Sequence, residues 1–163
     1  MYPDEISAAE AVLRIYPEAL LEKTEREAYL QSQIGSKSLA DDVRVDGGGG
    51  IAPGERYAIA ADKDARLQCA RKIISAVKAG MSKLNQHEDR IIRLVLFDKA
   101  KPAEAARATG LSDSYVRALL HTAKQKAAPP CIYAYPLACK LRYVRDKEHK
   151  AKLRALRENE ERQ

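Results

Sequence analysis

Apolar positions in the middle of the chain recur with the spacing of a helix seam. Between residues 57 and 84 they alternate in steps of three and four, at Ala70, Ile73, Val77, Gly80 and Leu84. Residues at this spacing lie along one side of a helix, so the segment predicts a long helix that packs against another. The expected partner is a helix from Pro17 to Ile34, which would complete an antiparallel hairpin.

The two helices of this hairpin are separated by residues 35–56, which include four consecutive glycines from 47 to 50. Ordering such a segment costs more conformational entropy than its few apolar residues offset, so a flexible loop is predicted. A phosphate-cradling glycine loop is the sharper alternative, but no Gly-Lys-Ser/Thr follows it. Residues 1–83 are therefore interpreted as a helical arm. Its second helix is longer than its first, which favours a homo-oligomer that covers the excess.

A different pattern occupies residues 84–128 and predicts shorter helices. Asn85 and Glu88 have the spacing of a capping box, which places a helix start at residue 85. Pro102 is suited to the first turn of the next helix. Lys99 to Lys101 would form the turn between the two, and the consecutive prolines 129 and 130 would end the last helix of this unit.

Within this unit, the spacing of small, turn and core residues is typical of a helix-turn-helix. Ala106 is small enough for two helices to cross closely, and Gly110 tolerates the left-handed backbone of a tight turn. Ser112 would cap the next helix, with Val116 and Leu119 facing the core.

After residue 129 the sequence predicts a third region, a basic helical tail that restarts near Pro136. The chain has one Phe and no Trp, and its apolar residues are mostly Ala, Leu and Ile, which favours helices over sheets. The predicted fold class is all-α: a long antiparallel hairpin, a helix-turn-helix domain and a basic C-terminal helix.

Charge divides along the chain in the same way as the apolar pattern. Residues 1–61 carry six Lys/Arg against eleven Asp/Glu, whereas residues 71–126 carry twelve against five and residues 127–163 nine against five. Excess positive charge on a helix-turn-helix and on the segment after it is expected where a surface meets phosphates. The sequence therefore predicts double-stranded DNA as a partner.

The predicted second helix of the motif presents a set of candidate DNA-contacting side chains. Arg117 can donate two hydrogen bonds to guanine in the major groove, and Ser112 and Ser114 are short enough for phosphates or base edges. Asp113 would accept from cytosine or stabilise the helix N-terminus. One further candidate leaves alternatives open: Tyr115 would reach a phosphate or pack against Phe97 or Leu94. The remaining candidates are a recognition-helix residue, His121, and surrounding cations that would bind phosphates without regard to sequence, Lys99, Lys101, Arg107, Lys124 and Lys126.

The residues give little indication of catalysis, of metal or cofactor binding, or of membrane contact. No nucleophile stands beside a base, so no catalytic site and no enzyme activity are predicted, and no cofactor is expected. Cys131 and Cys139 lack the close pairing of structural zinc sites, so no metal is expected and the cysteines are interpreted as apolar filler. No apolar run approaches the length of a membrane span and no signal peptide is evident, which predicts a cytoplasmic protein without membrane contact.

From Leu84 onward, the order Leu84, Glu88, Ile91, Ile92, Ala105, Ala106, Gly110, Leu111, Ser112, Val116, Arg117 resembles the region-4 DNA-binding domain of bacterial sigma factors. With two preceding helices and the segment DGGGGIAPGE, the chain resembles phage transcriptional regulators of the RinA/ArpU type from about residue 17 to residue 126. The resemblance implies a regulator of phage or prophage late genes that acts at a promoter and contacts RNA polymerase. It places Ser112 and Arg117 on the recognition helix. Leu96, Phe97 and Ser114 depart from the sigma pattern, and the tail after residue 130 lies outside it.

Two other functions are compatible with a helical arm that carries a helix-turn-helix. One is a DNA-packaging adaptor similar to a small terminase subunit, which would assemble into a ring of many subunits. The other is an antiterminator that travels with RNA polymerase and would co-purify with it in the absence of promoter DNA.

Overall fold

The structure is a computed structural model that describes residues 4–41 and 52–160, without the side chains of residues 35–41 and 159–160. The described residues form helices joined by short turns and contain no strand, which confirms the all-α prediction for this part of the chain. In chain order the elements are α1 Glu5–Arg14, α2 Tyr16–Asp41, α3 Pro53–Lys63, α4 Ala65–Met81, α5 Gln86–Ile92, the π-helical turn η1 Arg93–Phe97, α6 Pro102–Thr109, α7 Asp113–Ile132 and α8 Tyr135–Glu160.

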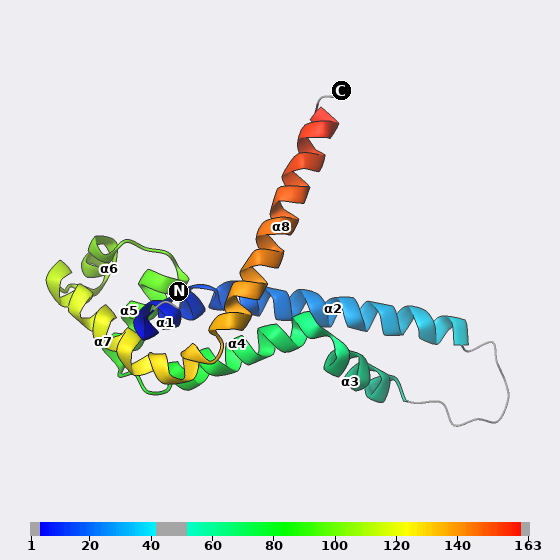
Figure 1. Ribbon diagram of the computed structural model, residues 1–163, viewed down its shortest axis with the longest axis horizontal. Helices are drawn as coiled ribbons and strands as arrows, with labels where there is room; N and C mark the ends of the chain where they lie inside the picture. Colours follow the sequence, from blue (N-terminus) through cyan, green and yellow to red (C-terminus); the bar gives the residue numbers. More distant parts are fainter. Residues whose placement is uncertain (1–3, 42–51, 161–163) are drawn as a thin grey trace.

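The helices are arranged as a body with two projections (Figure 1). The body contains α1, α5, η1, α6 and α7. One projection is the pair α2 and α4, which run side by side in opposite directions, with α3 packed against both near its far end. The other is α8, which rises from the middle of the molecule and extends its C-terminal half into solvent.

The core is centred on α7, which contacts α1, α4, α5 and α6. Gly80 of α4 allows the closest approach: a Cβ placed there would lie 2.9 Å from the carbonyl oxygen of Ala127. The apolar seam predicted for residues 57–84 is buried at Ala70, Ile73, Val77 and Gly80, with Leu84 partly buried. It packs against α7 as well as α2, because α4 lies between them.

The predicted loop at residues 35–56 is wrong at both of its ends. Helix α2 continues past Gly35 to Asp41, and α3 begins at Pro53, while residues 42–51 lie outside the described residues. One glycine inside a helix costs only about 1 kcal/mol relative to alanine, which a long run of helix formers before it can offset. Pro53 occupies the first helical position, where its missing N–H is not needed.

The predicted single helix over residues 57–84 is in fact two helices that meet at Asp64. The Asp64 side chain accepts a hydrogen bond from the backbone N–H of Leu67 (2.8 Å) and so caps α4. The same carboxylate forms an ion pair with Arg26 of α2. Its burial would raise the pKa of Asp64, but the bonds from Arg26 and Leu67 outweigh this and lower it.

Pro129 and Pro130 do not end α7 as predicted, because the helix continues through both to Ile132. Each proline removes a backbone hydrogen bond. This loss is offset on the inner side of the helix, where Ala127, Ala128 and Cys131 are buried in the core. The chain then turns at Tyr133 and Ala134 and enters α8 at Tyr135, one residue before the predicted Pro136.

The core does not follow the divisions expected at residues 84 and 129. Helix α1, from the predicted arm, packs more extensively on α7 than any other helix does, and α8 packs on α4 and α1. One continuous core includes Leu13 of α1, Ile73 of α4, Val116 of α7 and Leu141 of α8. A smaller cluster of Leu30, Ala61 and Leu67 stabilises the outer part of the α2–α4 pair.

Candidate nucleic-acid interface

Helices α6 and α7 are joined by a tight turn whose local geometry was predicted correctly. Gly110 has the left-handed backbone (φ 70°, ψ 20°), and its N–H donates to the carbonyl of Ala106. The Ser112 hydroxyl accepts from the backbone N–H of Tyr115 (3.3 Å), so Ser112 caps α7. Ala105 and Ala106 are buried where α6 meets its neighbours. The turn therefore fixes where the first turns of α7 point.

The first half of α7 has one buried and one exposed face. Val116 and Ala123 are fully buried and Leu119 is partly buried between them. On the opposite face, Ser114, Arg117 and His121 are exposed at steps of three and four residues. Such residues are aligned along one side of a helix, so these three side chains form a row of polar groups that is open to a ligand. We call these three residues the α7 row.

Arg117 is the only member of the α7 row for which the described structure gives an ion pair, and its partner is on the same helix. The Arg117 Nε lies 2.9 Å from Oδ2 of Asp113, one turn earlier, and both side chains are well exposed. Exposed pairs of this kind contribute only a few tenths of a kcal/mol, so a stronger acceptor can replace Asp113. The second carboxylate oxygen of Asp113 is shielded from solvent and has no hydrogen-bond partner in the described structure.

Tyr115 and two of the predicted phosphate contacts, Lys101 and Arg107, also have exposed side chains. Tyr115 is 52% exposed, and Phe97, which with Leu94 was a predicted packing partner, contacts Tyr16, with the ring centroids 4.9 Å apart. Lys101 precedes α6 with an exposed side chain, and its backbone N–H donates to Glu104 (2.9 Å). Arg107 is exposed on α6. These three side chains are therefore accessible to a ligand, as those of the α7 row are.

Lys124 does not lie free on this surface, contrary to its predicted role. Its ammonium is 2.8 Å from Oε2 of Glu10 on α1, and only 16% of its side chain is exposed. Burial would raise the pKa of Glu10, but hydrogen bonds from Lys124 and Arg14 outweigh it and lower that pKa. We therefore remove Lys124 from the candidate contacts. The cause is that α1 packs against α7, which the sequence pattern did not reveal.

Lys126 also forms an ion pair within the protein. Its ammonium is 2.6 Å from Oε1 of Glu88, a carboxylate that is almost fully buried and also accepts from the backbone N–H of Asn85 (3.0 Å). Burial would raise the pKa of Glu88, but the bonds from Lys126 and Asn85 lower it. The predicted capping box at Asn85 and Glu88 is confirmed, since Asn85 also accepts from the N–H of Glu88 (2.9 Å).

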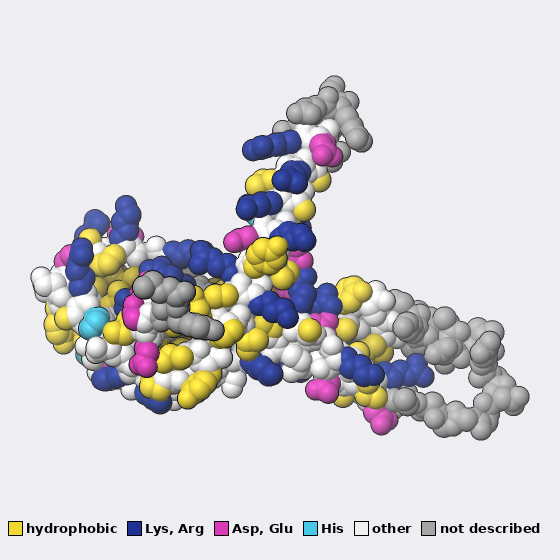
Figure 2. All heavy atoms as spheres, viewed as in Figure 1, with side chains coloured by type: hydrophobic (Ala, Val, Ile, Leu, Met, Phe, Trp, Pro, Cys, Tyr) yellow, Lys and Arg dark blue, Asp and Glu magenta, His cyan; other side chains and the backbone are white. Residues whose placement is uncertain are grey.

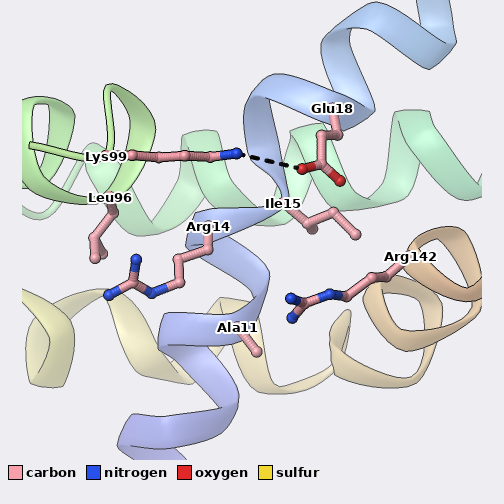
Figure 3. A pocket seen from close by; sticks show the side chains of 7 residues that line it. All are labelled: Ala11, Arg14, Ile15, Glu18, Leu96, Lys99 and Arg142. Atoms are coloured by element: carbon pink, nitrogen blue, oxygen red, sulfur yellow. Dashed lines mark ion pairs between the residues drawn. The ribbon is translucent and has the colours of Figure 1, made fainter. Parts of the chain in front are cut away.

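A group of cations that was not predicted as a set surrounds a hollow between α1, α8 and the turn after η1 (Figure 3). Arg14, Lys99 and Arg142 line it together with Glu18, and Lys99 approaches Glu18 to 3.9 Å. Lys99 has a positive φ of 58°, which is unusual for a residue with a side chain. These cations come from distant parts of the sequence, so no spacing could have signalled that they meet.

The cysteines show no arrangement suited to metal binding or nucleophilic chemistry. Among the described side chains, those of residues 4–34 and 52–158, no three from His, Cys, Asp or Glu come together as a metal site would require. Cys69 and Cys131 are buried, and Cys139 is exposed. Burial raises the pKa of Cys131 to about 11, which keeps it as an unreactive thiol at neutral pH.

Comparison with known proteins gives no relative for this chain: no protein-family model, no curated protein and no solved structure matches it. No helix in the described part of the chain has the length and apolar character needed to cross a bilayer.

Proposed function

We propose that this protein is a sequence-specific DNA-binding transcriptional regulator in which α6 and α7 form the helix-turn-helix and α7 is the recognition helix. The observation that carries the proposal is the α7 row, Ser114, Arg117 and His121, exposed directly opposite the buried Val116 and Ala123. An α-helix fits the major groove, and a row of donors along its outer side can reach base edges there.

In this arrangement Arg117 is the main base-reading residue. Its guanidinium exchanges the weak pair with Asp113 for two hydrogen bonds to guanine O6 and N7, which are charge-assisted on the donor side. The exposed Lys101, Arg107 and Tyr115 bind phosphates, which positions the helix but carries no sequence information. Ser112 keeps its capping role, because its hydroxyl already accepts from the Tyr115 N–H.

The biological setting rests on the resemblance to phage regulators of the RinA/ArpU type. By that resemblance the protein acts at a promoter of phage or prophage late genes and contacts RNA polymerase. Apolar residues exposed on the arm support a homo-oligomer, because burying them against a second copy removes them from water; they are Leu20, Leu21, Tyr29 and Ile59. The same residues would also form the contacts between subunits in a ring-shaped packaging adaptor. Light scattering of the purified protein distinguishes such a ring from a dimer.

Selection of bound sequences from random duplex DNA, followed by mobility-shift assays on the selected site, tests the proposal. Arg117→Ala should weaken binding to the selected site by about 1–3 kcal/mol and relax preference at one base pair. The matched variant Arg107→Ala should weaken selected and random duplexes equally. A wild-type protein that shows no preference over competitor DNA, or equal and uniform losses in the two variants, would refute the assignment.

A further inference from the structure

Helix α8 carries a stripe of cations on its outer side. Tyr143, Lys147, Lys150, Arg154 and Arg157 follow one another at steps of four, three, four and three residues, and all five are exposed. This spacing places them along one face of a helix. Within the described residues none of the four cations forms an ion pair, and the flanking acids Asp146 and Glu158 form none with them. We call these five residues the α8 stripe.

Charged residues on the opposite side of α8 are paired with residues of other helices. Arg145 donates to Glu22 (2.8 Å) and to Glu25 (3.0 Å), both on α2. Glu148 accepts from Arg66 of α4, which also binds the fully buried Glu22. Charge-assisted hydrogen bonds therefore attach the inner side of α8 to α2 and α4. The outer stripe takes no part in this attachment.

Left alone, the outer half of α8 is unfavourable as a helix. Every side chain from Asp146 to Glu158 is exposed, and the bond from Arg66 to Glu148 is near the start of this segment, so the rest of it has little tertiary support and is marginal as a helix in water. Like charges three and four residues apart also repel one another and destabilise the helix further. A ligand with regularly spaced negative charges neutralises these cations and so removes the repulsion between them.

Cations of α8 and cations of the α6–α7 end are visible on the same face of the molecule (Figure 2). Figure 2 shows Lys and Arg side chains along the side of α8 that faces the α6–α7 end, and more of them on the body between the two. The hollow lined by Arg14, Lys99 and Arg142 lies at the base of α8 (Figure 3). From Lys147 to Arg157 the helix rises about 15 Å, a length that corresponds to roughly four phosphates of one strand of a duplex.

We propose that the α8 stripe is a second DNA contact, which binds the phosphate backbone beside the site read by α7 and is independent of sequence. This inference rests on the proposed DNA-binding function and extends it to the C-terminal helix. Lys147, Lys150, Arg154 and Arg157 neutralise phosphates, and Tyr143 lies at the inner end of the stripe, where its hydroxyl donates to a further phosphate oxygen.

The test compares two variants of the full chain that remove equal charge from different places. In the stripe variant, Lys147, Lys150, Arg154 and Arg157 are changed to Gln. In the control variant, the exposed lysines of α3, α4 and the turn after α4 are changed to Gln, namely Lys63, Lys72, Lys78 and Lys83. Gln is a good helix former and all eight side chains are exposed, so both variants should keep their folds, which circular dichroism checks.

Fluorescence anisotropy with a random-sequence duplex at several salt concentrations gives the result. In the stripe variant, the slope of log affinity against log salt should become less steep by about 3–4. Between 50 and 200 mM salt, its affinity should therefore fall by a factor that is roughly a hundred times smaller than the factor for the wild type. The control variant should change the slope far less. Arg154→Lys with Arg157→Lys should keep the wild-type slope, because phosphate binding needs a cation and no particular fork geometry.

The outcomes separate this inference from the proposed function. If the wild type prefers its selected site but the stripe and control variants have equal slopes, the stripe is not a DNA contact and the function stands. If the wild type binds no duplex, both proposals fail. Stripe-dependent binding to poly-glutamate, with no stripe dependence on DNA, would overturn the inference in favour of an acidic protein surface.

Discussion

Along α7, the N-terminal half holds Ser114, Arg117 and His121 in solvent, whereas the C-terminal half is enclosed between α1 and α4. Cations occur in both halves. Arg117 pairs only with Asp113 of its own helix, while Lys124 pairs with Glu10 of α1 and Lys126 with Glu88 of α5. The cations of the second half therefore hold helices together, and the cation of the first half remains available to a ligand.

The comparison teaches that a basic residue is available to an anionic ligand only where no neighbouring helix supplies an acid. Spacing within a helix says which face a residue occupies, but it does not say what packs against that face. The same rule separates the two sides of α8, where Arg145 is bound to Glu22 and the α8 stripe is unpaired. The predictions below test this division from the largest expected effect to the smallest.

Gly80→Ala should give the largest effect, because it pushes α4 away from the enclosed half of α7. The added Cβ would lie 2.9 Å from the Ala127 carbonyl oxygen, too close without a shift of backbone. We expect a loss of about 1–2 kcal/mol in the free energy of unfolding, since overpacking outweighs the higher helix propensity of Ala. Urea unfolding followed by circular dichroism measures it. Gly54→Ala is the matched control, because nothing lies within 4 Å of its added Cβ; equal effects would contradict close packing at Gly80.

Glu88→Gln should reduce stability by about 1 kcal/mol through loss of a charge-assisted hydrogen bond. Because the folded pKa of Glu88 is lowered from 4.5, its contribution is present above that value and is lost as the pH falls through the folded pKa. The melting temperature between about pH 3 and pH 7 should thus fall less steeply on acidification in Glu88→Gln than in the wild type. Parallel curves would show that the pair with Lys126 contributes nothing.

Lys124→Ala and Lys101→Ala should separate a cation held by the protein from one that is free. Lys124→Ala should cost about 0.5 kcal/mol of stability and leave the salt dependence of DNA binding unchanged. Lys101→Ala should leave stability unchanged and lower the slope against log salt by about 0.9, the value for one phosphate. Thermal melts and anisotropy on the same preparations measure both quantities. A lower slope for Lys124→Ala would mean that Lys124 leaves Glu10 to bind DNA.

Asp113→Asn should have only a small effect on folding and is expected to leave the fold intact. It removes an exposed pair with Arg117 and a negative charge at the N-terminus of α7, which together contribute about 0.5 kcal/mol. A thermal melt at low salt detects a loss of this size. A loss several times greater would show that Asp113 has a structural role beyond the pair.

The sequence predicted the local parts of the candidate interface well and the long-range parts poorly. Asn85, Gly110 and Ser112 act as predicted, because a cap or a turn is decided by residues within three or four positions of it. Prolines 129 and 130 were misinterpreted as a helix end, since the core contacts that keep them in α7 come from other helices. Asp64 was missed as a cap because its neighbours are all compatible with a continuous helix.

What the sequence determined by itself was the helical class, the apolar seam of α4 and the exposed row on α7, all of which follow from periodicity and local capping. Only the tertiary structure decided that α1 covers α7, that Lys124 and Lys126 are paired, and that the outer side of α8 is free. The physical reason is that pairing depends on groups distant in the chain. Glu10 reaches Lys124, and Glu22 reaches Arg66, only after the helices have packed.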